Sequence, residues 1–183
     1  MKIILASSSP RRKELLKEIF PSFLTLSPDC DEANSATPQK TVLNLSKLKA
    51  DWVSDEYDIL ISADTIVVYK NQILGKPSSP EDAIKILSLL SGKYHKVYTG
   101  VCIKYNRNGI IKSMNFYDCS KVKMRKLSQK DIEDYVNTGS PLDKAGAYGI
   151  QDGVVERYYG SYSNIVGLPL EKIKRKLKRV DLI

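Results

Sequence analysis

Basic side chains crowd the start of a predicted helix near the N-terminus. A Ser-Ser-Ser-Pro sequence at 7–10 precedes it, in which Ser9 suits the N-cap and Pro10 the first helical position. Arg11–Lys13 follow in the first turn, although the helix macrodipole already places partial positive charge there. An anion held by the serine hydroxyls, the free backbone N–H groups and the guanidinium groups would explain this arrangement. A solvated first turn with a good cap is an equal alternative on physical grounds.

A single carboxylate interrupts an apolar, β-rich run at 58–69. Asp64 lies in the middle of this predicted strand, where an unpaired carboxylate is expensive to bury. It therefore needs a cation, a metal ion or a place at the open end of the strand. Enzymes use such carboxylates to hold Mg²⁺ or to activate a water molecule. A strand-end aspartate that caps a turn is the alternative.

A glycine-rich stretch, DKAGAYGIQDG at 143–153, is a weaker signal for ligand binding. Its glycines allow a close approach of backbone to a ligand, and Lys144 supplies charge beside them, but glycine clusters most often form turns. Lys76 in LGKP is most often a surface lysine in such a context. The chain has neither a P-loop nor a dinucleotide-binding fingerprint.

The predicted elements that carry these residues alternate between strands and helices. In chain order they are a strand at 2–6, a helix from Pro10, a helix at 37–53, a strand at 58–69 with a short return in ILGKP, a helix from Ser79 to Gly92, strands at 94–105 and 110–125, a helix from Ser128 to about Gly139, a strand pair near 154–167 and a basic helix after Pro169. The two central strands are joined through Asn108-Gly109, which is typical of a hairpin. The pattern predicts an α/β fold with a mixed sheet.

Composition limits the class of protein. The 183 residues, 42% of them hydrophobic and 27% charged, predict one domain over residues 1–183 or two small lobes sharing a core. No apolar run reaches the ~18 residues of a membrane span, and the apolar stretch at the N-terminus is too short for a signal peptide. Three cysteines without a C-x-x-C pair argue against a disulfide framework and a zinc ribbon. The one histidine, His95, excludes mechanisms built on several histidines and is interpreted as structural.

The net charge of +8 is concentrated near the C-terminus. Six basic residues and no acidic one occur at 172–179, and the remaining 23 basic residues nearly balance 21 acidic ones. Ile173, Leu177 and Val180 in this run share a helical face that can dock on the core while the lysines stay solvated. The charge therefore favours a docked terminal helix over a nucleic-acid contact.

These residues together resemble the Maf family of nucleoside triphosphate pyrophosphatases. The resemblance rests on LASSSPRRKELL, SADTIVV with LGKP after it, LSGKYHKVYTG, and YVNTGSPLDKAGAYGIQ followed by GSYSNIVGLPL, which spread from residue 5 to residue 170. It implies an elongated, twisted mixed sheet with flanking helices and two lobes around a cleft, similar to inosine triphosphate pyrophosphatases. It also implies hydrolysis of a nucleoside triphosphate to the monophosphate and pyrophosphate with a divalent cation, Mg²⁺ or Mn²⁺. Family members are commonly cytoplasmic, and a homodimer is a further expectation.

The resemblance also implies roles for particular residues. Asp64 matches the position of the catalytic carboxylate, as proton acceptor or metal ligand, and Glu32 is a looser match for a second acidic residue at the metal. The candidates for binding the triphosphate are Ser7, Ser9, Arg12, Lys49, Lys76 and Lys144.

Three positions distinguish the subgroups of the family. This chain has Arg11, Thr65 and Gln151, as the dTTP/UTP-directed group does, whereas the 7-methyl-GTP-directed group tends to carry tryptophan, glutamine and glutamate there. The expected substrates are therefore dTTP and UTP. Two alternatives are a 7-methyl-GTP pyrophosphatase of the same family and a nucleic-acid-binding or septation-regulating module, which the basic tail and the family's link to septum formation keep open.

Overall fold

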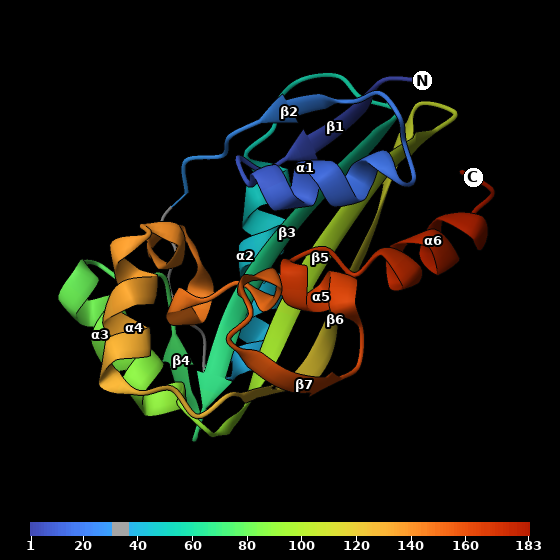
Figure 1. The fold of residues 1–183 in the computed structure, drawn as a ribbon. Coiled ribbons are helices and arrows are strands. Elements are labelled where there is room, and N and C mark those ends of the chain that lie inside the picture. Colours follow the sequence, from blue (N-terminus) through green and yellow to red (C-terminus); the bar gives the residue numbers. More distant parts are fainter. Residues whose placement is uncertain (31–36) are drawn as a thin grey trace. The chain divides into compact units, whose positions relative to one another are not determined.

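The computed structural model of the chain describes residues 1–30 and 37–183 (Figure 1). Its elements, in chain order, are β1 (Ile3–Ala6), α1 (Pro10–Lys17), β2 (Leu24–Leu26), α2 (Pro38–Asp51), β3 (Ile59–Tyr69), β4 (Gln72–Leu74), α3 (Pro80–Leu90), β5 (Tyr94–Arg107), β6 (Ile110–Met124), α4 (Gln129–Asn137), the 3₁₀ turns η1 (Ser140–Asp143), η2 (Ala145–Ala147) and η3 (Ile150–Asp152), β7 (Val155–Tyr159), α5 (Tyr162–Val166) and α6 (Leu170–Lys178). None of the described helices is both long and apolar enough to cross a membrane.

The described strands form one twisted, open, mixed sheet of seven strands. Six follow the order β2-β1-β3-β5-β6-β7, and β4 pairs with β3 off this path. β1 runs parallel to β2 and β3, whereas the β3–β4 and β6–β7 pairs are antiparallel. The turn between β5 and β6 has positive φ at Asn108 (55°) and Gly109 (81°), as the Asn-Gly signal predicts. The predicted α/β class with a mixed sheet and flanking helices is confirmed.

The chain divides into two compact units. Unit 1 comprises Met1–Thr65, Thr99–Asp118 and Ser161–Ile183, and unit 2 comprises Ile66–Tyr98 and Cys119–Gly160. The boundaries fall inside β3, β5 and β6, so these three strands contribute residues to both units. A single domain over residues 1–183 stays a prediction.

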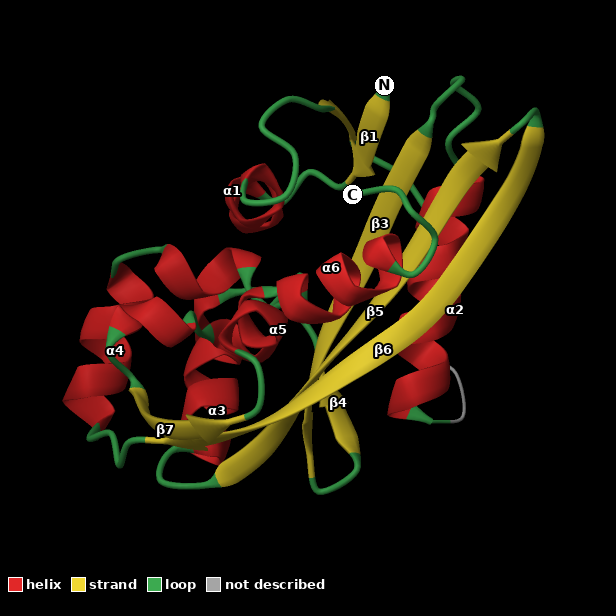
Figure 2. Cartoon of the chain, turned by 90° about the vertical axis from the view of Figure 1, so that its right-hand side faces the viewer, coloured by secondary structure: helices red, strands yellow, loops and turns green. Residues whose placement is uncertain are grey.

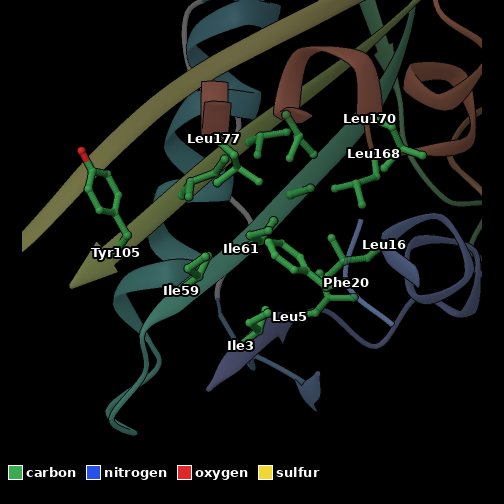
Figure 3. Packing of buried hydrophobic residues seen from close by; sticks show 14 of the residues in the cluster. Ile3, Leu5, Leu16, Phe20, Ile59, Ile61, Tyr105, Leu168, Leu170 and Leu177 are labelled. Carbon is green, nitrogen blue, oxygen red and sulfur yellow. The ribbon is translucent and has the colours of Figure 1, made fainter. Parts of the chain in front are cut away.

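Unit 1 has hydrophobic clusters on both faces of its part of the sheet. In β1, Ile3 and Leu5 belong to a cluster with residues of α1 and α6 (Figure 3). Ile4 and Ala6 belong to a second cluster with Ala50 at the end of α2. Side chains of a strand alternate between faces, so β1 is buried on both sides and reads as a continuous apolar run. Figure 2 shows α6 and α2 on opposite sides of β3, β5 and β6.

The helix α2 faces the sheet with small residues that the hydrophobic pattern did not indicate. Val42, Leu45, Leu48 and Trp52 recur at helical spacing in the sequence, but only Val42 and Leu45 of these are buried, and Leu48 is 42% and Trp52 46% exposed. The buried stripe continues instead through Ser46 and Ala50, which are fully buried. Because Lys49 follows Val42 by seven positions and Leu45 by four, it shares this inward face.

β5 passes very close to α2. A Cβ atom on Gly100 would lie 2.1 Å from the backbone oxygen of Val42, a distance that no side chain tolerates. Glycine at position 100 therefore sets the depth at which α2 packs on the sheet.

Unit 2 contains α3 and α4, and its helix ends follow the sequence signals. Ser128 and Asp131 form a capping box at the start of α4. Ser79 caps α3. In the first turn of this helix, the Asp82 carboxylate accepts from the backbone N–H of Ser78 at 2.9 Å.

The predicted strand pair near 154–167 is wrong in its second half. β7 is a strand, but the residues after it form the short helix α5. Gly160, with φ of 109°, ends the strand, and the Ser161 side chain caps the helix by accepting from the N–H of Asn164 at 3.1 Å. The serine cap and the glycine before it explain why this segment forms a helix. The strand β2 was not predicted, because its three residues are too few to show the alternating pattern of a strand.

Candidate active site

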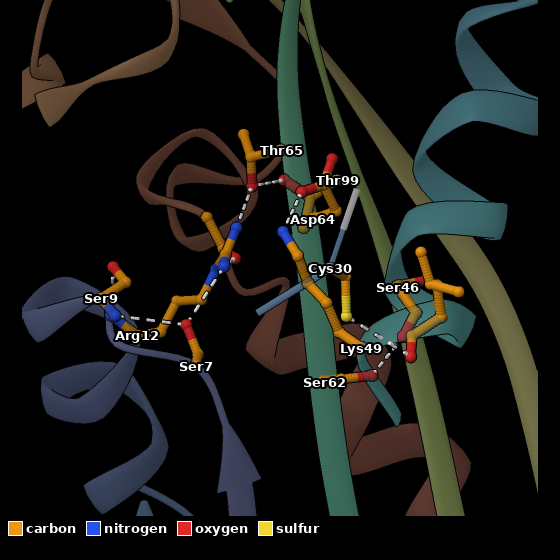
Figure 4. Close-up of polar contacts among 12 residues, drawn as sticks. Ser7, Ser9, Arg12, Cys30, Ser46, Lys49, Ser62, Asp64, Thr65 and Thr99 are labelled. Atoms are coloured by element: carbon orange, nitrogen blue, oxygen red, sulfur yellow. Dashed lines mark hydrogen bonds and ion pairs between the residues drawn. The ribbon is translucent and has the colours of Figure 1, made fainter. Parts of the chain in front are cut away.

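Asp64 is a buried carboxylate paired with a buried ammonium group. It lies in β3 with 5% of its surface exposed, and its Oδ1 is 2.6 Å from Nζ of Lys49 in α2 (Figure 4). The side chains are 8% and 13% exposed, respectively. Burial without a partner would cost several kcal/mol, so Lys49 supplies the cation that the sequence required. Asp64 Oδ2 makes no hydrogen bond or ion pair with any residue that the structure describes.

α2 is fixed to β3 at a second point beside this pair. The hydroxyl of Ser62 donates to the backbone oxygen of Ser46 at 2.6 Å, and Ser62 precedes Asp64 by two positions. Residues two apart in a strand share a face, so Ser62 and Asp64 both point toward α2. The serine bond and the close approach at Gly100 hold Lys49 within reach of the carboxylate.

Arg12 lies on the opposite face of β3, and its guanidinium group contacts three other segments of the chain. Its Nε donates to the backbone oxygen of Gly167 at 2.8 Å, its Nη1 to Ser7 Oγ at 3.2 Å and its Nη2 to Thr65 Oγ1 at 3.0 Å (Figure 4). Thr65 follows Asp64 directly, so its side chain leaves the other face of the strand. Arg12 therefore links α1, β3 and the turn before α6, a structural role that the sequence did not reveal.

The serine-rich turn is organised around the start of α1. Ser9 is the N-cap, as predicted, and its hydroxyl accepts from the N–H of Arg12 at 3.4 Å. The buried Ser7 hydroxyl accepts from Arg12 and from the N–H of Ser9 at 3.3 Å. Arg11 is half-buried in the same first turn. The structure thus brings Ser7, Ser9 and Arg12 together at a helix N-terminus, an arrangement suited to an anion, and Thr65 lies beside them.

The other candidates, Lys76, Lys144 and Gln151, belong to unit 2. Lys76 and Gln151 are exposed, whereas Lys144 is 8% exposed. The Lys144 ammonium donates to the backbone oxygen and the hydroxyl of Ser140 and to Asp143 at 2.8 Å. An ammonium has three hydrogens, so Lys144 would exchange one of these partners to bind a phosphate.

The loop that carries Gln151 is tied to α4 by a network that the sequence did not indicate. The Tyr135 hydroxyl donates to Asp152 Oδ2 at 2.5 Å and accepts from the N–H of Gly149 at 3.1 Å. Burial and the hydrogen bond to Asp152 raise the pKa of Tyr135, so the phenol stays protonated. Tyr135 thus binds the chain on both sides of Gln151, through the Gly149 N–H and the Asp152 carboxylate.

His95 is an interior residue of unit 2. Its Nε2 lies 2.7 Å from the Tyr148 hydroxyl, and its Nδ1 is buried without a hydrogen-bond partner among the described residues. Burial lowers the pKa of His95 to about 4. These contacts support the structural interpretation of this histidine.

The described residues contain no group of three His, Cys, Asp or Glu side chains that could hold a metal ion. Glu32, the second acidic residue expected at a metal, lies outside the described residues.

Comparison with known proteins identifies the class. A family model described as Maf-like protein matches residues 2–180, and the chain belongs to this family. Relatives in Lachnoclostridium phytofermentans, Clostridium tetani and Thermosipho melanesiensis are 42%, 46% and 48% identical to it. The matches cover 99%, 100% and 94% of this chain and 97%, 99% and 94% of the relatives. All three relatives are named dTTP/UTP pyrophosphatase.

Proposed function

We propose that the chain hydrolyses dTTP and UTP to the nucleoside monophosphate and pyrophosphate. The observation that carries this proposal is the buried Asp64–Lys49 pair. A carboxylate is costly to bury in an apolar strand, and such buried ionisable groups are concentrated at functional sites. The names of the relatives and the match of Arg11, Thr65 and Gln151 to the dTTP/UTP-directed group support the choice of substrate.

Asp64 is proposed as the group that accepts the proton of the attacking water. Lys49 orients the carboxylate through Oδ1, which leaves Oδ2 to face the water. Phosphoryl transfer spreads negative charge over the phosphate oxygens, so catalysis depends mainly on positioning and on electrostatic stabilisation. The hydroxyls of Ser7 and Ser9, the start of α1, and the cations Arg12, Lys49, Lys76 and Lys144 are the proposed sources of that stabilisation.

The carboxylate of Asp64 is an oxygen donor of the kind that a divalent cation, Mg²⁺ or Mn²⁺, prefers. Mg²⁺ is commonly held by one or two carboxylates together with substrate phosphate oxygens and water, so Asp64 Oδ2 would hold the ion in place of accepting the proton. Glu32 is the second candidate ligand. When bound, the ion neutralises charge on the phosphates. We also propose that the protein is cytoplasmic and forms a homodimer.

The test compares Asp64→Asn with Asp58→Asn. Asp58 precedes the same strand, and its exposed carboxylate accepts from the backbone N–H of Lys2. Pyrophosphate release from dTTP, UTP, CTP, GTP and 7-methyl-GTP is measured with Mg²⁺ or Mn²⁺. We expect the wild type to prefer dTTP and UTP, Asp64→Asn to lose about 100-fold or more in kcat, and Asp58→Asn to stay active. Full activity in a folded Asp64→Asn variant would remove Asp64 from catalysis, and a preference for 7-methyl-GTP would overturn the substrate assignment.

A further inference from the structure

A chain of hydrogen bonds runs through the hydroxyl group of Thr65. Arg12 Nη2 lies 3.0 Å from Thr65 Oγ1, which lies 2.9 Å from Thr99 Oγ1 in β5. Thr99 Oγ1 in turn lies 3.0 Å from the backbone oxygen of Asn164 in α5. Thr99 is fully buried, whereas Thr65 is half-buried, and all four residues belong to unit 1.

The direction of every bond in this chain is fixed by chemistry. The Asn164 backbone oxygen can only accept, so it takes the single hydroxyl hydrogen of Thr99. Thr99 therefore has no hydrogen left for Thr65, and the bond between the two hydroxyls must use the hydrogen of Thr65. The guanidinium of Arg12 can only donate, and its Nε is held by Gly167.

This direction limits what Thr65 can offer to a ligand. Its one hydrogen goes to Thr99, and one of its two lone pairs receives Arg12. The second lone pair remains, so the exposed side of the hydroxyl is an acceptor and not a donor. A hydroxyl group that rotated freely would present both.

We propose that Thr99 is a positioning residue that makes Thr65 an acceptor-only contact for the substrate. The inference rests on the proposed function, in which Thr65 belongs to the set that selects dTTP and UTP. The ligand group must then be a hydrogen-bond donor, either the N3–H of uracil or thymine or a hydroxyl of the sugar. Cytosine carries an acceptor at N3, so in the first case it would face a lone pair and be rejected.

The test measures kcat/KM for UTP, CTP and a UTP that lacks the 3′-hydroxyl. Thr99→Val keeps the shape of the side chain but removes the acceptor, which releases the hydrogen of Thr65 to rotate toward the substrate. We expect the UTP:CTP ratio to fall about tenfold if the donor is the base, and the ratio of UTP to its 3′-deoxy form to fall about tenfold if it is the sugar. Thr99→Ser restores the hydroxyl and should keep both ratios within about twofold of wild type.

Two controls separate this role from packing. Thr41→Val removes another fully buried hydroxyl, one that donates to the backbone oxygen of Thr37, the N-cap of α2, and should leave both ratios unchanged. Thr65→Val removes the acceptor itself and should lower the same ratio as Thr99→Val, which keeps the test decisive if Thr99→Val does not fold.

The inference is overturned if a folded Thr99→Val, or Thr65→Val in its place, keeps both ratios, or if Thr99→Ser changes them as much as valine does. A wild-type protein that releases no pyrophosphate from dTTP or UTP would instead refute the proposed function.

Discussion

Removing Lys49 while leaving Asp64 in place should destabilise the protein strongly. Lys49→Met keeps most of the length and apolar stem of the side chain but leaves a carboxylate that is 8% exposed without its cation. Breaking a buried ion pair on one side typically costs 3–5 kcal/mol, because the remaining charge is neither solvated nor paired. At about 3 kcal/mol, a protein of this size should melt roughly 6–12 °C lower.

The measurement is the free energy of unfolding in urea for the wild type, Lys49→Met, Asp64→Asn and the double variant. Asp64→Asn in the Lys49→Met background removes the uncompensated charge, so we expect the double variant to be about 2 kcal/mol more stable than Lys49→Met. Lys47→Met is the matched control. Lys47 lies in the same helix and pairs with Asp51 at 3.6 Å, but with side chains 63% and 45% exposed its loss should cost less than about 1 kcal/mol.

The reasoning fails if Lys49→Met costs no more than Lys47→Met, or if the double variant is as unstable as the sum of the two single changes. Either result would mean that Asp64 in the folded protein needs no cation, because water solvates it or because it is protonated.

Three further predictions address other parts of the molecule. Burial lowers the pKa of His95 from its usual 6.5 to about 4, so the unfolded chain binds a proton before the folded protein does as the pH falls. About 3 kcal/mol of the free energy of unfolding should therefore be lost between pH 6.5 and 4. His95→Phe should flatten this part of the curve of stability against pH. Gly100→Ala places a Cβ 2.1 Å from Val42 O and should cost about 3 kcal/mol in urea unfolding, whereas Gly75→Ala, with no atom within 4 Å of the new Cβ, should cost little. Gln151→Glu should lower the UTP to 7-methyl-GTP ratio of kcat/KM by about tenfold, since an ionised glutamate has only acceptors, and equal losses on both substrates would assign Gln151 to loop structure instead.

Local signals in the sequence predicted the local structure well. Ser9 with Pro10, the capping box of Ser128 and Asp131, and the Asn108-Gly109 turn each depend on residues within four positions of one another. Their energetics are nearly independent of the rest of the chain.

Contacts between distant segments could not be predicted in the same way. Asp64 was identified because a carboxylate in an apolar strand requires a partner, but nothing in the sequence showed that Lys49 supplies it through a stripe of small residues in α2. Arg12 was expected to serve an anion, and its bond to Gly167 spans 155 positions. Such contacts depend on the topology of the sheet, which residue patterns do not specify.

The order in which unit 1 is assembled from the chain has a consequence for biosynthesis. Its main cluster joins Ile3 and Leu5 to Ile173 and Leu177, which lie far later in the sequence. During synthesis β1 therefore has no α6 to cover it until residues 170–178 have left the ribosome. Unit 2 ends at Gly160, so its residues emerge before α6 does. Truncation within α6 would leave the apolar face of β1 open and make the nascent protein a substrate for chaperones and proteases.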